Sequence, residues 1–548
     1  MMKVCRDERP LPDMADAGAY YWKSGRYKTY TLGWCEECHR WLHPAREYCH
    51  TCFSAARQRA ASGKAVLRAY TVNYHKWLSG YSPPYIIAIV SPVEDVSIQV
   101  TTNILSIDPD RLFIGMHLEA HFEPQEDLWI PVFKEALEKE EISISKESPS
   151  KSEINLKEIN FILPKEKYED KVVFSGIGKS EIGRNLGRSQ LSLTLDACRK
   201  AIYDAGLQSS DIDGVCAYPG VTGMAGFSSG GVRELAYSMN LTPVWHSGGH
   251  EFPGQTGPLV SAMMAISAGL CRHVLCFTAF SSSVLPSSGR ERITGERRWS
   301  LPYGCVSPAN WIAMYATRYM ELYNADEKLL GKVAIAARKH AALNPDSLYR
   351  EPLDMETYLE SRKISSPFKL LDCDTPCDGA VAFVISGVGY ADEMPVKPVY
   401  VESCGTAFNE VQSWDQGSIV YQPNVTSAAR HLWSRTSMTP ADIDVAELYD
   451  GFTFNAVCWL EALGFCGPGE ADDFIGDGSR IVLGGELPLN THGGHLNAGR
   501  SNGYGHLYEA ILQLRGSAGD RQVSGALTAM TSCGGGIPAG ALLLRSFK

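Results

Sequence analysis

Two segments that lie far apart in the chain repeat one local pattern, and this repeat constrains the fold more than any other feature. The segment AIYDAGLQSSDIDGVCAY (201–218) resembles HLWSRTSMTPADIDVAELY (431–449), because each holds a helix end, a polar turn, the triplet Asp-Ile-Asp and a strand. The strand RHVLCFTAF (272–280) is likewise echoed by GALTAMTS (525–532). Such self-similarity indicates a duplication. The sequence therefore predicts two similar α/β halves, with a functional site where they meet.

The residues before the first repeat support this α/β interpretation. VVFSGIG is typical of a strand that ends in glycine. In SLTLDACRKAIYDAGL, one helical face holds Leu193, Ala197, Ala201 and Ala205, and the following glycine can cap the helix. The glycines of GIGKSEIG have the spacing GxGxxxxG, which matches neither the dinucleotide fingerprint nor the phosphate-loop motif. We therefore interpret them as a turn.

Four cysteines near the N-terminus form two CxxC knuckles separated by ten residues. They are Cys35 and Cys38 in CEEC, and Cys49 and Cys52 in CHTC. Four soft thiolate ligands with no open position suit a structural zinc ion, although unmetallated cysteines on a loop are the alternative. Because four cysteines complete the shell, the neighbouring His39, His43 and His50 are expected at the surface of the ribbon.

The chain divides into five predicted units. An N-terminal helix and zinc ribbon occupy 1–63, and the β-rich runs of 64–134 predict a small β-barrel. Residues 135–170 are rich in Lys, Glu and Ser, which predicts a solvated linker. The two α/β halves follow at 171–395, with a loop insertion, and at 396–548.

Composition restricts the classes of function. Hydrophobic residues make up 44% of the 548 residues and the formal net charge is −11, so an extended nucleic-acid surface is not expected. No signal peptide and no apolar run of about 18 residues is found, so the protein is expected to be cytoplasmic and without a membrane span. Apart from the two knuckles, the sixteen cysteines are scattered through apolar segments, which favours buried free thiols.

Several motifs of the last two-thirds resemble the thiolase superfamily, in its sterol-carrier, lipid-transfer branch. They are DAGLQSSDIDGV, LLDCDTPCDGAVAFVIS (370–386), ELYDGFTFNAVCWLEALGFCGPGE (447–470), GGHLNAGRSNGYGHLYEAILQLRG (493–516) and SCGGG (532–536). The resemblance implies a duplicated fold layered α-β-α-β-α. The first 134 residues are similar to the proteins with a rubredoxin-like zinc ribbon and an OB fold that partner such thiolases and help hold the acyl-CoA.

The catalytic positions of the family have changed in this chain. No cysteine occurs in TPVWHSGGHEFPGQTGPLVSAMMAISAGL (242–270), where the thiolase nucleophile would stand. Tyr449 and Arg500 stand where the family has catalytic histidines, and only Cys533 of the CxGxG-like motif remains. This combination resembles the thiolase-like aldolases of steroid side-chain degradation, which cleave a β-hydroxyacyl-CoA without a covalent intermediate.

The resemblance gives candidate roles to residues of these motifs. Tyr449 is the first candidate for the base or proton shuttle, with Arg500 as a cation that lowers its pKa. Tyr504 and His506 are further proton-transfer candidates, Asp450 is expected to fix the loop, and Cys533 is a possible remnant of thiolase chemistry. Candidates for binding the CoA thioester are His250, Glu251, Gly493, Gly494, Gly499 and Gly503, together with Arg290, Arg292, Arg297 and Arg298 for its phosphates. Each retains a structural alternative, such as packing, a loop surface or a solvated charge run.

We expect an acyl-CoA aldolase that releases propionyl-CoA or acetyl-CoA from a bulky, steroid-like or ring-bearing β-hydroxyacyl-CoA, and that forms a homodimer through its α/β domain. One alternative is an acyl-CoA C-acyltransferase that uses Cys533. The other is a non-catalytic acyl-CoA-binding scaffold.

Overall fold

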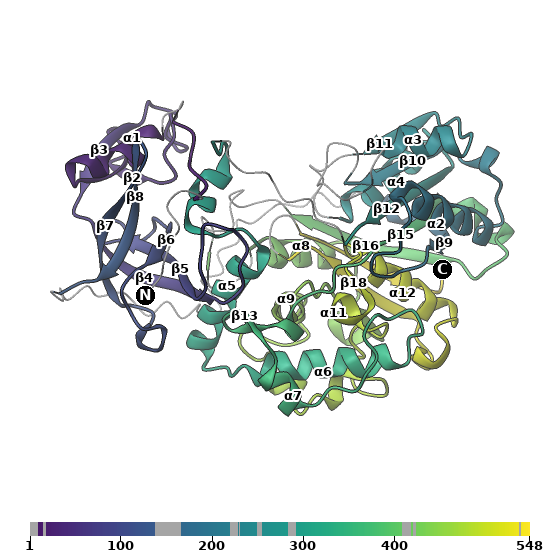
Figure 1. Ribbon diagram of the computed structural model, residues 1–548. Coiled ribbons are helices and arrows are strands. Elements are labelled where there is room, and N and C mark those ends of the chain that lie inside the picture. Colours follow the sequence, from purple (N-terminus) through teal and green to yellow (C-terminus); the bar gives the residue numbers. More distant parts are fainter. Residues whose placement is uncertain are drawn as a thin grey trace.

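The computed structural model describes residues 9–14, 18–137, 166–219, 228, 231–248, 255–282, 292–407, 418–419, 423–535 and 539–548. These residues form sheets of three, seven and nine strands. The two smaller sheets lie at one end of the molecule and the nine-stranded sheet at the other (Figure 1). Within the described ranges, no helix is long and apolar enough to cross a membrane.

The N-terminal sheet carries the four-cysteine cluster. Helix α1 (Ala19–Lys23) and turn η2 (Ser24–Tyr27) precede strands β1 (Tyr30–Cys35), β2 (Arg40–Leu42) and β3 (Arg57–Ala61), in the order β2-β1-β3. The predicted surface position of His43 is wrong. Its ring is buried against Tyr21 and Trp299, with ring centroids 5.3 and 5.1 Å away, because the ribbon docks there on a segment of the α/β domain.

The second sheet is the predicted β-barrel. Its strands are β4 (Lys64–Asn73), β5 (Tyr85–Pro92), β6 (Val100–Ile104), β7 (His117–Gln125) and β8 (Leu128–Glu135), and pairing of β4 with β7 closes it. Two strands from the α/β domain, β13 (Lys363–Ser365) and β14 (Phe368–Lys369), extend this sheet through the pair Ser365 and Asn73. The barrel is therefore joined to the α/β domain by backbone pairing.

The nine-stranded sheet shows the duplication directly. Its strands are β9 (Val172–Lys179), β10 (Gly214–Tyr218), β11 (Trp245–Gly248), β12 (His273–Phe280), β15 (Gly379–Gly387), β16 (Val399–Ala407), β17 (Val445–Glu447), β18 (Thr528–Cys533) and β19 (Ala539–Arg545). The order β10-β12-β15-β9 in the first half is matched by β17-β18-β19-β16 in the second, and β9 pairs with β16 at the centre. The echoed sequence segments thus occupy equivalent strands.

Helices pack on the outer faces of the two halves of this sheet, and a further pair of helices packs between the halves. Helices α2 (Gln190–Asp204) and α3 (Gly231–Ser238) share one core with the first-half strands, and α8 (Pro423–Trp433) and α9 (Thr453–Ala462) share another with the second-half strands. Helices α4 (Gly257–Ser267) and α12 (Tyr504–Arg515) lie together in a third core that contacts strands of both halves. These cores confirm the layered α-β-α-β-α fold.

The insertion in the first half packs the barrel against the second half. Its helices are α5 (Pro308–Tyr323), α6 (Lys328–Ala342) and α7 (Met355–Glu360), and α10 (Ala471–Ile475) and α11 (Gly494–Ala498) follow in the second half. The barrel residues Tyr81 and Tyr85 belong to the same core as Ile312 of α5. The remaining turns are η3 (Pro109–Arg111), η4 (Glu169–Lys171), η5 (Ser209–Asp211), η6 (Glu296–Trp299), η7 (Leu301–Tyr303), η8 (Leu370–Asp372), η9 (Val388–Glu393), η10 (Pro440–Asp442), η11 (Ser479–Ile481) and η12 (Gly519–Arg521).

Most of the predicted linker, residues 138–165, lies outside the described residues. Its last residues do not behave as a solvated linker. Glu169 is fully buried and pairs with Arg435 at 2.6 Å, and Lys167 donates to the carbonyl of Glu402 at 2.7 Å. The α/β domain therefore begins a few residues before Lys171, because these charged side chains find partners on the second half.

Candidate active site

The candidate site is built where two neighbouring parallel strands end. Strand β17 ends just before Tyr449, and β18 ends at Cys533. The Tyr449 N–H donates to Oγ of Ser532 at 2.9 Å, which holds the two strand ends together. Side chains that follow the carboxyl ends of adjacent parallel strands meet at one edge of a sheet. The changed YDGF motif and the remaining cysteine are therefore neighbours.

Asp450 ties this motif to the glycine-rich loop. Its Oδ1 accepts the backbone N–H of His495 at 2.8 Å and lies 2.9 Å from Nε2 of His506, and the side chains of Asp450 and His506 are fully buried. Asp450 thus has the structural role expected for it. Helix α12 begins at Tyr504, two residues before the predicted start at His506, and His506 in its first turn holds Asp450 instead of facing an open pocket.

His495 was not among the sequence-predicted site residues, although it lies in the quoted loop. The Gly503 N–H donates to Nε2 of His495 at 3.1 Å, and Oγ of Ser501 lies 3.2 Å from the same nitrogen. Because a backbone N–H can only donate, Nε2 is the unprotonated nitrogen and the proton sits on Nδ1. Burial lowers the pKa of His495, so the ring is neutral.

Asp450, His495 and His506 place ligand atoms within 4.8 Å of one another, as a metal site would. The tautomer of His495 does not suit a metal site, because a metal ligand needs a free nitrogen lone pair. Nε2 of His495 already accepts the Gly503 N–H, and Nδ1 carries a proton. We interpret the three side chains as a hydrogen-bonded support. The ring of Tyr449 packs edge-on against the ring of His495, with ring centroids 5.1 Å apart, and so connects this support to the phenol.

Tyr449 shares its surroundings with two charged residues. Arg500 lies beside Asp374, with 3.6 Å between Nε and Oδ2, and its backbone N–H donates to the carbonyl of Thr375 at 2.8 Å. Burial and the charge of Asp374 raise the pKa of Tyr449, while Arg500 lowers it, and the net shift is upward. The predicted cation is therefore present. Since it is offset by Asp374 and by burial, the phenol stays protonated at neutral pH.

Asp374 was also missed by the sequence interpretation. Its only sequence signal is its place inside the family-like segment LLDCDTPCDGAVAFVIS, five residues before the start of β15. Its relation to Arg500 depends on a contact between segments more than a hundred residues apart, which a single sequence does not reveal.

Cys533 and Tyr504 lie deeper in the molecule. Cys533 is buried, and the Thr256 N–H donates to its Sγ at 3.2 Å. Burial raises the pKa of Cys533 to about 11, so a thiolate is scarce at neutral pH. Tyr504 is 2% exposed and packs its ring 5.4 Å from that of Phe383, and burial raises its pKa. Both residues line one small cavity.

The glycines of the loop serve close packing. Glycines 493, 494, 499 and 503 all have positive φ, and a Cβ at Gly494 would lie 1.8 Å from Oδ2 of Asp450. The N–H groups of Gly493 and Gly503 already donate, to the carbonyl of Asn490 and to His495. The predicted thioester donors are thereby reduced to Gly494 and Gly499.

A buried polar network contacts the segments that carry the site residues. Glu447 accepts from the N–H of Thr491 at 2.9 Å and lies 2.9 Å from Nδ1 of His492, and Glu509 pairs with Arg521 at 2.9 Å. Burial and the neighbouring Glu509 raise the pKa of Glu447 to about 8, and burial lowers that of His492 to about 3. The network fixes the residues that flank Tyr449 and the glycine loop.

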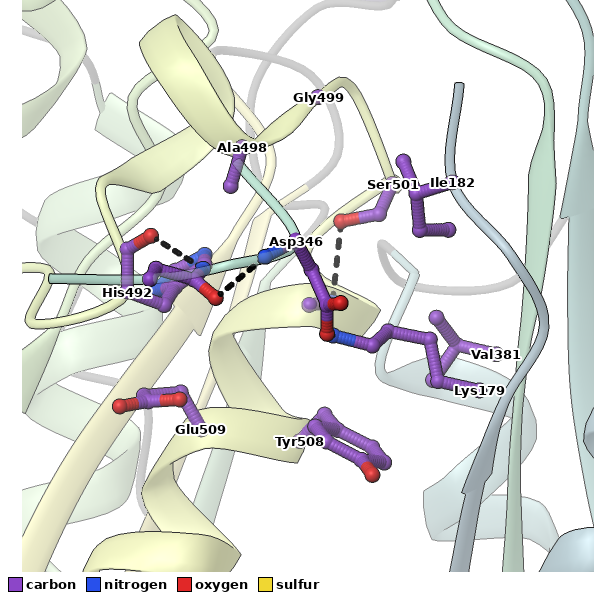
Figure 2. A pocket seen from close by; sticks show the side chains of 12 residues that line it. Lys179, Ile182, Asp346, Val381, His492, Ala498, Gly499, Ser501, Tyr508 and Glu509 are labelled. Carbon is purple, nitrogen blue, oxygen red and sulfur yellow. Dashed lines mark hydrogen bonds and ion pairs between the residues drawn. The ribbon is translucent and has the colours of Figure 1, made fainter. Parts of the chain in front are cut away.

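A water-sized cavity lies behind the glycine loop (Figure 2). It measures about 30 Å³, room for one or two waters, and is lined by Ser501, His492 and the ion pair of Lys179 with Asp346. It is too small for an acyl-CoA, and it does not include Tyr449.

The predicted phosphate-binding arginines are separated by the structure. Arg292 pairs with Glu126 and Asp127 of the β7–β8 turn, each at 2.8 Å, so it joins the barrel to the α/β domain. Arg297 is exposed on η6, and no ion pair is described for it within the covered ranges. His250, Glu251 and Arg290 lie outside the described residues.

The four ribbon cysteines come together as predicted. Sγ of Cys35 lies 3.5 Å from that of Cys52, and Sγ of Cys38 lies 3.9 Å from that of Cys49. The N–H of Thr51 donates to the Cys49 sulfur at 3.4 Å, which suits a thiolate. Each of the other cysteines in the described part is a free thiol, buried or half-buried.

Comparisons with known proteins agree with this geometry. Residues 405–543 match the family described as "Thiolase C-terminal domain-like", and residues 58–123 match "ChsH2, C-terminal OB-fold domain". The chain is 35% identical over 385 residues to "17-hydroxy-3-oxo-4-pregnene-20-carboxyl-CoA lyase" of Mycobacterium tuberculosis, covering 67% of this chain and 97% of that protein. The chain belongs to this family of thiolase-like aldolases.

Two further proteins place the chain within that family and its fold. A "Steroid side-chain-cleaving aldolase" of Thermomonospora curvata is 35% identical over 386 residues, covering 68% of this chain and 96% of the relative. The solved structure titled "Ltp2-ChsH2(DUF35) aldolase" superposes with a TM-score of 0.63 and 34% identity, covering 69% of this chain and 98% of that chain. Human mitochondrial 3-ketoacyl-CoA thiolase, at 13% identity, a TM-score of 0.53 and coverage of 70% of this chain and 100% of that chain, shares the fold alone.

Proposed function

We propose that this aldolase cleaves a bulky β-hydroxyacyl-CoA into a ketone or aldehyde and propionyl-CoA or acetyl-CoA. The observation that carries the proposal is the cluster of a protonated phenol, a guanidinium and a carboxylate in Tyr449, Arg500 and Asp374, with no thiolate beside it in the described residues. Such a set transfers protons and stabilises negative charge, and it does not supply an acyl acceptor.

The reaction needs three events. The β-hydroxyl loses its proton as the carbonyl forms, the Cα–Cβ bond breaks, and its electron pair moves onto the thioester as an enolate. A proton is then delivered to Cα. The neutral phenol of Tyr449 is suited to that delivery, and the Arg500 guanidinium is suited to stabilising the enolate oxygen.

A ring-bearing, steroid-like acyl group is supported by the substrates named for the two most similar relatives reported above. Arg297 supports recognition of the CoA phosphates, since it is an exposed guanidinium without a described ion pair. Cys35, Cys38, Cys49 and Cys52 would hold a structural zinc ion, which would tie the ribbon together and take no part in the chemistry.

The edge of the large sheet supports a homodimer. In the described residues β11 pairs only with β10, so its other side has open backbone groups. Apolar side chains near this edge are exposed, with Val244 at 75% and Met264 at 50%. An edge strand flanked by exposed apolar residues suits association with a second copy.

The function is tested by incubating the protein with a panel of bulky and small β-hydroxyacyl-CoAs and following free propionyl-CoA or acetyl-CoA together with the carbonyl product. Cleavage of at least one bulky member is expected, with the two products in equal amounts. Failure across the panel would contradict the proposal. A stable acyl adduct in intact-protein mass spectrometry would instead favour the acyltransferase that uses Cys533.

A further inference from the structure

Three aspartates lie in the segment LLDCDTPCD, and their carboxylates differ in how fully they are used. The buried carboxylates of Asp372 and Asp378 accept three and four hydrogen bonds. Asp374 accepts none from the described residues, among which its ion-pair partner is Arg500 at 3.6 Å. Asp374 is thus the aspartate of this segment with lone pairs available for a substrate proton.

Asp374 and the Tyr449 hydroxyl both lie against Gly451. The Asp374 N–H donates to the carbonyl of Gly451 at 3.0 Å, next to the bridge between Cys373 and Phe452. A Cβ on Gly451 would lie 2.8 Å from the Tyr449 hydroxyl oxygen, so this hydroxyl packs directly over the glycine. Gly451 is therefore a shared neighbour of the two residues, and no larger residue fits there without moving the phenol.

Both charged side chains are reachable. The side chain of Asp374 is 15% exposed and that of Arg500 is 31% exposed, whereas those of Asp450 and His506 are fully buried. A substrate hydroxyl can approach Asp374 without displacing a structural hydrogen bond. By contrast, the candidates predicted from sequence for the second proton transfer, His506 and Tyr504, are enclosed by protein.

The environment of Asp374 also favours a base. Burial and the nearby Asp450 carboxylate raise the pKa of Asp374, while Arg500 lowers it, and the net shift is upward. A carboxylate whose pKa lies closer to the working pH accepts a proton more readily in the transition state than an ordinary surface aspartate does.

We infer that Asp374 is the general base of the reaction, an inference that rests on the proposed aldolase function. The carboxylate takes the β-hydroxyl proton as the carbonyl forms and the Cα–Cβ electron pair moves onto the thioester as an enolate. Tyr449 gives its phenolic proton to Cα, which completes the acyl-CoA product. The carboxylic acid of Asp374 then releases its proton to solvent, and the phenolate takes one up from solvent. The cycle closes with no net gain or loss of protons.

The test compares Asp374→Asn with Asp374→Glu in the full-length protein, using a β-hydroxyacyl-CoA that the wild type cleaves. Asparagine keeps the size of the side chain but cannot accept the proton, so kcat is expected to fall about 10²- to 10⁴-fold, with KM changed by less than about threefold. The acidic limb of the kcat/KM pH profile is expected to disappear in Asp374→Asn and to persist in Asp374→Glu. Asp472→Asn is the control, because Asp472 also pairs with a cation, Lys332 at 2.6 Å, away from the site.

The outcomes distinguish a failure of the proposed function from a failure of the assignment of Asp374 as the base. If the wild type cleaves no substrate, the proposed function fails. If the wild type cleaves and Asp374→Asn keeps its kcat, or loses activity but retains the acidic limb, only the assignment of Asp374 is overturned. In the second case Asp374 would merely position Arg500. Circular dichroism and thermal melting of each variant show whether a loss of activity reflects unfolding.

Discussion

At the scale of single residues, the Tyr449 hydroxyl is the group whose removal tests the proposed proton delivery. Tyr449→Phe keeps the ring that packs edge-on against His495 and removes only the phenolic hydroxyl. We expect kcat to fall about 10²- to 10⁴-fold with KM little changed, measured by release of short-chain acyl-CoA. Tyr400→Phe on β16, far along the chain from both motifs, is the control and is expected to keep wild-type activity. An unchanged kcat in Tyr449→Phe would exclude the phenol as the proton donor.

Gly494 tests the packing of the catalytic loop on Asp450. A Cβ at this position would lie 1.8 Å from Oδ2 of Asp450, and the backbone has φ of +64°. Gly187 has φ of +66° but no atom within 4 Å of the corresponding position. Both Gly→Ala variants therefore pay the conformational cost of about 1–3 kcal/mol, and Gly494→Ala should lose additional stability and activity. Denaturant unfolding of the two variants isolates the contact, and equal losses would show that Asp450 yields without cost.

At the scale of secondary-structure elements, the sequence predicted strands and helices better than it predicted contacts between them. The echoed triplets identified β10 and β17 as equivalent strands because local periodicity and turn chemistry are repeated there. The CxxC spacing brought four sulfurs together because short knuckles dictate their own geometry. In contrast, the burial of His43 and the pairing of Asp374 with Arg500 depend on which segments dock, and no local pattern carries that information.

Glu447 on strand β17 is a buried carboxyl group whose ionisation makes stability depend on pH. Burial raises the pKa of Glu447 from 4.5 to about 8. Between these values Glu447 is ionised in the unfolded state and keeps its proton in the folded state, so its contribution makes the free energy of unfolding fall as pH rises from about 4.5 to about 8. Glu447→Gln should weaken this fall, measured by denaturant unfolding at pH 5, 7 and 9. Glu234→Gln, an exposed control on α3, should leave it unchanged. If the difference in unfolding free energy between wild type and Glu447→Gln does not change over this range, the assignment is contradicted.

At the scale of the whole molecule, the ribbon and barrel are part of the architecture that carries the site. Phe368 of β14, one of the two strands that extend the barrel sheet, stacks on Phe452 of the YDGF motif with ring centroids 5.1 Å apart and planes at 5°. Tyr81 and Tyr85 share a core with helices of the insertion. The segment containing Asp374 leaves this junction directly. The barrel therefore helps to set the position of the catalytic motif through a short chain of backbone pairing and ring contacts.

Association of two copies through the free edge of the large sheet is also a property of the whole molecule. Lysine at both Val244 and Met264 would place charges beside β11, where 75% and 50% of these apolar side chains are exposed in the single chain. Burying an ammonium group in an apolar interface is costly, so the double variant is expected to be monomeric where the wild type is dimeric, by light scattering after size exclusion. Leu527→Lys is the matched control, because Leu527 is also 51% exposed but precedes β18 in the other half. A control that dissociates while the double variant stays dimeric would place the interface on the second half, and a monomeric wild type would remove the dimer altogether.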